Sequence, residues 1–245
     1  LELGGKSPNI VFGDANLDQA EAGVLAGIFA AAGQTCDAGS RAYIHESIYD
    51  AFVDRIVKRA QQITIGDPLK AATQMGPVAT KMQLEKDESM VARAVSEGAK
   101  VLTGGARPQI AEFPGGYFYQ PTIVHQLGKD NFLMRNEVFG PVLAVTPFKD
   151  EAEVLALAND TEFGLAAGVW TKDLSRAHKM ARALESGTVW INTYRALTFN
   201  SPFGGYKASG IGRQNGIEAV YQYLQNKSGW CERGDEVQEP VIMKV

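Results

Sequence analysis

The chain has 245 residues, of which 45% are hydrophobic and 21% are charged, and its formal net charge is −4. These values are ordinary for a globular α/β protein, and the length suggests one large domain or two small ones. The basic residues are dispersed, which excludes nucleic acid as an expected partner because its binding needs a concentrated basic surface. No apolar run approaches the roughly 20 residues of a membrane-spanning helix, so we expect no membrane partner.

Strand-like and helix-like stretches alternate along the chain, which is typical of an α/β fold with a mostly parallel open sheet and helices on both faces. Asp14 or Asn16 is a candidate cap for the first helix. We expect helices at 17–32, 46–63, 80–97, 150–159, 174–185 and 215–224, and strands at 8–12, 41–44, 100–102, 117–124, 141–148, 166–170 and 188–192.

The cysteines and histidines exclude two kinds of site. Two cysteines, Cys36 and Cys231, cannot build a disulfide framework, and two free thiols are consistent with a reducing, cytoplasmic location. The three histidines show no ligand spacing with each other or with a cysteine, so we predict no metal site.

Cys36 is the first candidate for chemistry. It lies among small residues between a predicted helix and a predicted strand, where a substrate and backbone amides can approach a side chain closely. The alternative is a structural cysteine, since free cysteine is among the most buried residue types. The residues alone leave both interpretations open.

Two acidic residues are further candidates. Glu2 precedes Gly4 and Gly5 and could act as a general base, although a solvated acid near the end of the chain would look the same. Glu137 and Phe139 face the same way if extended, as a ribose-binding carboxylate beside an aromatic ring would. A simple turn before a strand is the alternative for this pair.

The glycine-rich stretch 202–212 invites a phosphate-loop interpretation, which we reject. Gly210, Gly212 and Gly216 have the wrong spacing for a dinucleotide-binding motif, and no strand–helix context surrounds them. A connector is the better interpretation.

Four motifs, taken in order, resemble the NAD(P)-dependent aldehyde dehydrogenase superfamily, and the resemblance runs from Leu1 to about Trp230. They are Leu-Glu-Leu-Gly-Gly-Lys-Ser-Pro at 1–8, Gly-Gln-Thr-Cys-Asp-Ala-Gly-Ser-Arg at 33–41, Glu-Val-Phe-Gly-Pro at 137–141 and Ser-Pro-Phe-Gly-Gly-Tyr-Lys at 201–207. The resemblance implies oxidation of a small-molecule aldehyde to a carboxylic acid with NAD or NADP. NAD is favoured only as the commoner cofactor.

The resemblance also assigns roles to single residues. Cys36 matches the nucleophile that forms a thiohemiacetal and then a thioester, and Glu2 matches the base that activates water. Glu137 and Phe139 resemble the residues that hold the nicotinamide end of the cofactor. The remaining expected contacts are Gln83 and Leu3 for the cofactor and Phe203 for the aldehyde.

The sequence departs from the family pattern in two ways. The family's cofactor domain and an oxyanion-hole asparagine would precede Leu1, so we expect this chain to be a catalytic portion without them. Asp37, beside the nucleophile, replaces a small or apolar residue, and its charge disfavours a thiolate.

The resemblance divides the chain into three parts. We expect a catalytic domain at 1–203, a connector, helix and oligomerisation strand at 204–232, and a peripheral tail at 233–245. The stretch 221–231 resembles the strand through which family members pair, so we expect a homo-oligomer, a dimer or a tetramer. The alternatives for the isolated chain are esterase or thioesterase activity only, or an inactive chain that keeps an oligomerisation role.

Overall fold

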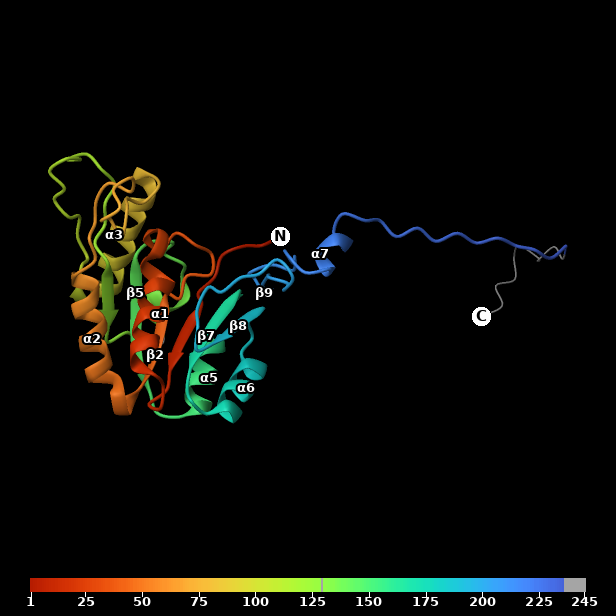
Figure 1. Ribbon diagram of the computed structural model, residues 1–245, viewed down its shortest axis with the longest axis horizontal. Coiled ribbons are helices and arrows are strands. Elements are labelled where there is room, and N and C mark those ends of the chain that lie inside the picture. Colours follow the sequence, from red (N-terminus) through yellow and green to blue (C-terminus); the bar gives the residue numbers. More distant parts are fainter. Residues whose placement is uncertain (129, 236–245) are drawn as a thin grey trace.

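A seven-stranded sheet forms the centre of the computed structural model, which describes residues 1–128 and 130–235 (Figure 1). The strand order is β3-β4-β5-β2-β1-β7-β8, and every neighbouring pair is parallel except the edge pair β3–β4. The strands are β1 (Pro8–Val11), β2 (Arg41–His45), β3 (Lys100–Thr103), β4 (Thr122–His125), β5 (Val142–Phe148), β7 (Ala166–Trp170) and β8 (Thr188–Ile191). The predicted fold class is confirmed.

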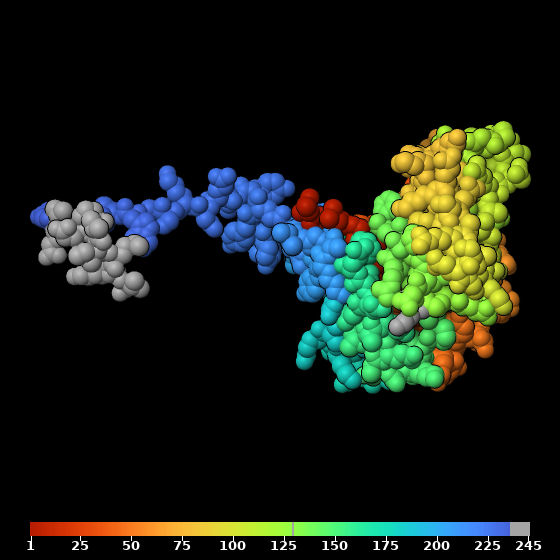
Figure 2. Space-filling model, turned by 180° about the vertical axis from the view of Figure 1, so that it is seen from behind, coloured from red at the N-terminus to blue at the C-terminus, as the bar shows by residue number. Residues whose placement is uncertain are grey.

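Helices cover both faces of this sheet. The connection from β1 to β2 and that from β5 to β7 run in opposite directions across it. Since such crossovers are right-handed, α1 and α5 lie on opposite faces. The view from behind accordingly shows the green to teal atoms of residues 150–180 in front (Figure 2). The helices are α1 (Leu17–Phe29), α2 (Tyr49–Gln61), α3 (Lys81–Ser96), α4 (Phe132–Arg135), α5 (Glu151–Asn159), α6 (Leu174–Ala183) and α7 (Glu218–Tyr221), with 3-10 turns at Ala30–Gly33 and Glu46–Ile48.

Polar caps and apolar stripes explain why these segments are helical. Asn16, not Asp14, caps α1 by accepting the backbone N–H groups of Asp18 and Gln19. Thr80 caps α3 in the same way. Helix α2 buries the stripe that its sequence predicts, including Phe52 and Ile56, against the sheet side of the molecule.

Arg41 fastens the first residues of the chain to the sheet. Its side chain is 1% exposed, and its Nε donates to Lys6 O at 2.8 Å. Its Nη2 donates to Ala158 O at 2.8 Å, at the carbonyl end of α5, where a cation is favoured. The segment before β1 is therefore held in place by a buried charge on β2.

The structure differs from the expected elements in several places. Strand β4 is shorter than the predicted 117–124 because Pro121 has no N–H to give to the ladder. Helix α7 is shorter than 215–224 because Asn215 and Gly216 have φ of 58° and 65°, outside helical geometry. A small two-stranded sheet, β6 (Phe163–Gly164) with β9 (Tyr206–Lys207), was not predicted.

Residues 221–231 form no strand in this single chain, so the expected oligomerisation strand stays a prediction. After α7 the backbone runs away from the sheet and is exposed as far as 235 (Figure 1). A strand needs a hydrogen-bonded neighbour, and the neighbour we expected is a second copy.

The domain boundaries stay predictions, and residues 236–245 of the predicted tail lie outside the described residues. Within the part described, no helix is both long and apolar enough to cross a bilayer.

Candidate active site

The candidate residues gather where the parallel strands begin, a region we call the amino edge. Residues 1–7 precede β1, residues 33–40 precede β2 and residues 137–140 precede β5. The pairing of β9 with β6 brings the glycine-rich stretch to the same edge, because β6 directly precedes β7. Four stretches far apart in sequence therefore meet at one place.

Cys36 and Glu2 lie side by side at this edge. The Cys36 Sγ is 3.9 Å from Glu2 Oε1, within reach of a hydrogen bond from the thiol to the carboxylate, and both residues are half-buried. The other Glu2 oxygen, Oε2, accepts the side-chain amide of Gln214. The carboxylate is thus oriented from one side and faces the thiol with the other.

The turn that presents Cys36 depends on a glycine. Gly33 ends the 3-10 turn after α1 with φ of 71°, and a Cβ on it would collide with the Gly140 carbonyl. Glycine favours this conformation, and only a residue without a side chain permits this close approach. The same contact brings the Cys36 loop against the loop that carries Glu137.

The thiol is hard to ionise in this setting. Burial raises the pKa of Cys36 above its ordinary value of 9.0, and the negative charges of Asp37 and Glu2 raise it further. Hydrogen bonds from the backbone N–H groups of Asp37 and Cys36 to the sulfur offset part of this rise. The thiol is therefore protonated at neutral pH and needs a base to react.

Glu137 lies against Gly4 and Gly5. Its Oε1 accepts the Gly5 N–H at 2.9 Å, and a Cβ on Gly4 would collide with the carboxylate. Glu137 and Phe139 lie in a loop and not in the extended stretch considered above, and Phe139 is half-buried with φ of 62°. This left-handed conformation is uncommon for a bulky residue and indicates a constrained loop.

Gln83 supports that loop from α3. Its side-chain amide donates to Val138 O at 2.9 Å and to Asp87 Oδ1 at 2.6 Å. Burial raises the pKa of Asp87 to about 7, although the bond from Gln83 acts in the opposite direction. In this structure Gln83 therefore anchors the loop, and its contact with a cofactor stays a prediction.

Phe203 and Leu3 occupy different surroundings. Phe203 is buried in an apolar cluster with Leu165, Ala166 and Trp190, and Cys36 packs against that cluster. Leu3 is exposed, and its backbone N–H donates to Ser209 O at 2.9 Å. The structure brings both to the amino edge, as the predicted roles require.

Three residues of this edge were not predicted. Gln214 contacts Glu2, Ser209 Oγ donates to Gly4 O at 2.6 Å, and Arg195 Nε lies 3.6 Å from Asp37 Oδ1. Each partner is more than 150 positions away in sequence, so no local spacing could have revealed these contacts.

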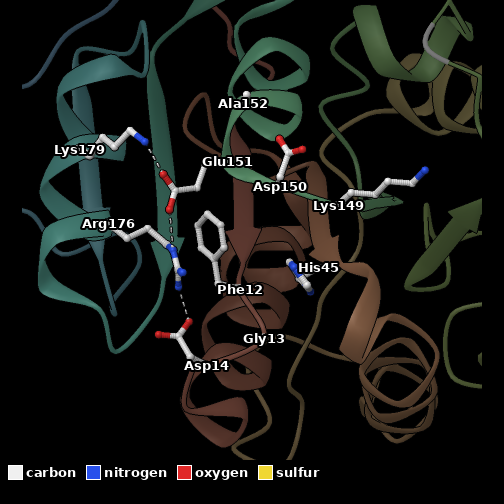
Figure 3. Close-up of a pocket in the computed structure, with 10 residues that line it drawn as sticks. All are labelled: Phe12, Gly13, Asp14, His45, Lys149, Asp150, Glu151, Ala152, Arg176 and Lys179. Carbon is white, nitrogen blue, oxygen red and sulfur yellow. Dashed lines mark hydrogen bonds and ion pairs between the residues drawn. The ribbon is translucent and has the colours of Figure 1, made fainter.

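The opposite, carboxyl edge has a surface depression of about 640 Å³ (Figure 3). Figure 3 shows a chain of charges there: Lys179 and Arg176 both bond to Glu151, and Arg176 also bonds to Asp14. These side chains bond to one another. Among the described residues, no group of three or more His, Cys, Asp or Glu side chains is placed to hold a metal ion.

Known proteins share both the sequence and this geometry. The aldehyde dehydrogenase family model matches residues 1–228. A betaine aldehyde dehydrogenase from Brucella anthropi is 47% identical over 234 residues, which are 96% of this chain and 48% of the relative. The corresponding protein of Brucella melitensis is equally similar. The chain thus spans about half the length of the curated relatives it matches.

Solved structures agree. The NAD+ complex of an aldehyde dehydrogenase from Bacillus cereus is 42% identical with a TM-score of 0.91, over 96% of this chain and 47% of the other. Betaine aldehyde dehydrogenase from Staphylococcus aureus, also solved with NAD+, is 42% identical with a TM-score of 0.90, over 92% of this chain and 45% of the other. The chain belongs to the aldehyde dehydrogenase family.

Proposed function

We propose that this chain carries the thiol chemistry of NAD(P)+-dependent oxidation of an aldehyde to a carboxylic acid. One observation supports this above all: the Cys36 Sγ lies 3.9 Å from the Glu2 carboxylate, and both residues are half-buried. A nucleophile beside a base is the arrangement that covalent catalysis needs. The overlap with the family covers both residues.

In the first half of the proposed reaction, Cys36 attacks the aldehyde carbon. Glu2 takes the thiol proton, directly or through a water molecule, because the raised pKa of Cys36 keeps the sulfur protonated at neutral pH. The new C–S bond converts the carbonyl into a thiohemiacetal oxyanion. The backbone N–H of Cys36 is a candidate donor to that oxygen.

In the second half, the thiohemiacetal becomes a thioester by loss of a hydride, and water then cleaves the thioester. Glu2 first releases the proton of Cys36 to solvent and then deprotonates that water; the acyl group leaves as the carboxylic acid, and the proton of the water returns from Glu2 to the Cys36 sulfur. Gln214 supports this role because its amide holds the Glu2 carboxylate without being able to accept the proton itself. Covalent capture and hydrolysis together divide one difficult reaction into two easier ones.

The cofactor would lie beside Glu137 and Phe139. The fit rests on the half-buried Glu137 carboxylate, whose close approach to Gly4 and Gly5 is possible because neither glycine has a side chain. Glu137 would bind ribose hydroxyls and Phe139 would support the flat ring, with Leu3 and Gln83 alongside. The chemistry that a bound nicotinamide supplies is acceptance of the hydride.

The aldehyde would approach past Phe203. This ring belongs to the apolar cluster against which Cys36 packs, so it would contact the carbon chain next to the reacting group. The relatives are named betaine aldehyde dehydrogenases, which makes betaine aldehyde the first compound to assay. The two solved complexes make NAD+ the first cofactor to assay, ahead of NADP+.

Ester hydrolysis is a second candidate activity for this chain. It needs only Cys36 and Glu2, whose contact does not depend on a cofactor. A homo-oligomer, dimer or tetramer, and a cytoplasmic location also remain proposals. The exposed stretch after α7 supports the homo-oligomer, and deletion of this stretch should lower the mass measured by light scattering.

A paired assay tests the proposed function. The purified chain is supplied with betaine aldehyde and NAD+, and separately with a nitrophenyl ester, each with the Cys36→Ala variant as the control. We expect the ester rate of the variant to fall by about 10⁴-fold, because removing a nucleophile leaves little covalent catalysis. An ester rate unchanged in Cys36→Ala would exclude Cys36 from the reaction.

A further inference from the structure

We propose that Arg195 is a positioning residue that offsets the negative charge of Asp37 beside the Cys36 thiol and so keeps that thiol reactive. This inference rests on the proposed role of Cys36 as the reacting group. It concerns Asp37, the acidic residue that directly follows Cys36 in the sequence.

The first observation is a buried ion pair next to the nucleophile. The Asp37 side chain is 7% exposed, and its Oδ1 lies 3.6 Å from the Nε of Arg195, whose side chain is 28% exposed. Arg195 pairs with no other carboxylate among the described residues. A buried carboxylate is stable only when it is paired, so Arg195 is the cation that permits Asp37 in this place.

The second observation is that Tyr194, the residue before Arg195, holds the main chain of Asp37. Tyr194 donates its hydroxyl to the Asp37 carbonyl at 2.9 Å. Its ring fills the space beside Gly27, Gly39 and Gly168, where a Cβ on any of the three would come too close to it. Two consecutive residues thus hold Asp37. Tyr194 bonds to the main-chain carbonyl of Asp37, and Arg195 pairs with its carboxylate.

The backbone of Arg195 points to the same conclusion. Its φ is 58°, a left-handed conformation that residues with long side chains rarely adopt. Such conformations persist only where the surrounding contacts enforce them. In this conformation the guanidinium lies beside Asp37, while the preceding residue, Tyr194, bonds to the Asp37 carbonyl.

The charged and titratable groups around Cys36 come from three segments. Glu2 lies on the segment before β1, Asp37 on the thiol's own loop, and Tyr194 and Arg195 follow β8. Burial and the nearby Asp37 raise the pKa of Tyr194, so its phenol stays neutral. Arg195 is therefore the cation of this group, and it offsets the charge of Asp37, with which it pairs.

The test is the pH dependence of Cys36 alkylation by iodoacetamide, measured on the Cys36 peptide by mass spectrometry. The full chain is used with Cys231→Ser, which leaves Cys36 as its one thiol. We expect Arg195→Gln to raise the midpoint of the alkylation profile by about one pH unit and Asp37→Asn to lower it by about one. The double variant should return to the parent midpoint, since its net charge near Cys36 equals that of the parent.

The controls separate charge from structure. Arg59→Gln, an exposed arginine on α2, should leave the midpoint in place. If Arg195→Gln does not fold, Asp37→Asn and the double variant still decide the matter, because both lack the unpaired buried carboxylate. Equal midpoints in those two variants, or no movement in the single variants, overturn the proposal. The measurement needs neither aldehyde nor cofactor, so failure of the proposed oxidation would not affect it.

Discussion

At the carboxyl edge of the sheet the polar side chains bond to one another, whereas at the amino edge the carboxylate of Glu2 faces the Cys36 thiol. Open α/β sheets usually bind ligands at the carboxyl edge, where the strand order reverses, here between β1 and β7. In this chain Asp14 occupies that position. It accepts hydrogen bonds from Thr171 Oγ1 at 2.9 Å and from the backbone N–H groups of Lys172 and Asp173, and it pairs with Arg176.

The amino edge differs in the kind of polar group it holds. It combines a half-buried thiol of raised pKa, a carboxylate that faces it and two residues, Phe139 and Arg195, in left-handed conformations. Shifted pKa values and constrained backbones together are typical of functional sites. The comparison shows that the state of the polar groups, and not the general rule for the fold, identifies the site.

The largest expected effect lies at the amino edge. Glu2→Gln should slow hydrolysis of the Cys36 thioester by about 10²–10⁴-fold, because it removes the general base while keeping a side chain of the same size. Pre-steady-state ester hydrolysis would show a burst of product followed by this slow phase. Glu151→Gln, a matched change at the carboxyl edge, should leave both phases unchanged. An equally slow second phase in Glu151→Gln would show that the slow hydrolysis is not specific to the amino edge.

The next effect lies at the carboxyl edge and concerns stability. Asp14→Ala should lower the free energy of unfolding by about 2 kcal/mol, since three hydrogen bonds and an ion pair are lost at a partly exposed site. Urea denaturation at pH 7 measures this change. Alkylation of Cys36 should keep its rate. A lower rate of Cys36 alkylation in Asp14→Ala would show that the two edges are coupled, contrary to this prediction.

The pH dependence of this contribution follows from the pKa of Asp14. Burial alone would raise that pKa, but the hydrogen bonds from Thr171 and Lys172 and the charge of Arg176 lower it below 3.8. A lowered pKa in the folded state means that the stability is present above about pH 4 and is lost as the pH falls through the folded value. The difference between the parent and Asp14→Ala should therefore shrink in acid.

A smaller effect is expected at Gly4. Gly4→Ala places a Cβ against the Glu137 carboxylate, which must move away from the Gly5 N–H. We expect NAD+ to bind about tenfold more weakly by calorimetry, equivalent to about 1.4 kcal/mol. Gly66→Ala is the control, because its Cβ would meet only Thr73 at an ordinary 3.4 Å. Equal affinity in Gly4→Ala and the parent would remove Glu137 from the cofactor site.

Local patterns predicted much of the fold but less of the site. The buried strand β1 and the amphipathic helix α2 have strong periodic signals, and both were found where expected. The motifs around Cys36 and Glu137 revealed the family because their residue types are distinctive. The contact of Gln214 with Glu2 joins positions 212 apart, and that of Arg195 with Asp37 joins two loops. Such pairs depend on the tertiary fold, which no local spacing encodes.

The smallest expected effect tests how the loop of Glu137 is supported. The folded pKa of Asp87, about 7, lies above its ordinary value of 3.8, so the folded state binds a proton more tightly than the unfolded state. The contribution of Asp87 to stability should therefore be greatest below about pH 4, decline as the pH rises to about 7, and stay level above that.

Asp87→Asn should remove this decline and raise the free energy of unfolding at pH 8 by about 1 kcal/mol, since it keeps an acceptor for Gln83 without a buried charge. Urea denaturation from pH 4 to pH 8 measures both changes. Asp54→Asn, at an exposed ion pair on α2, is the matched control and should keep the decline. A destabilised Asp87→Asn at pH 8 would mean that the charged carboxylate itself holds the loop. The amino edge would then depend on paired charges, as the carboxyl edge does.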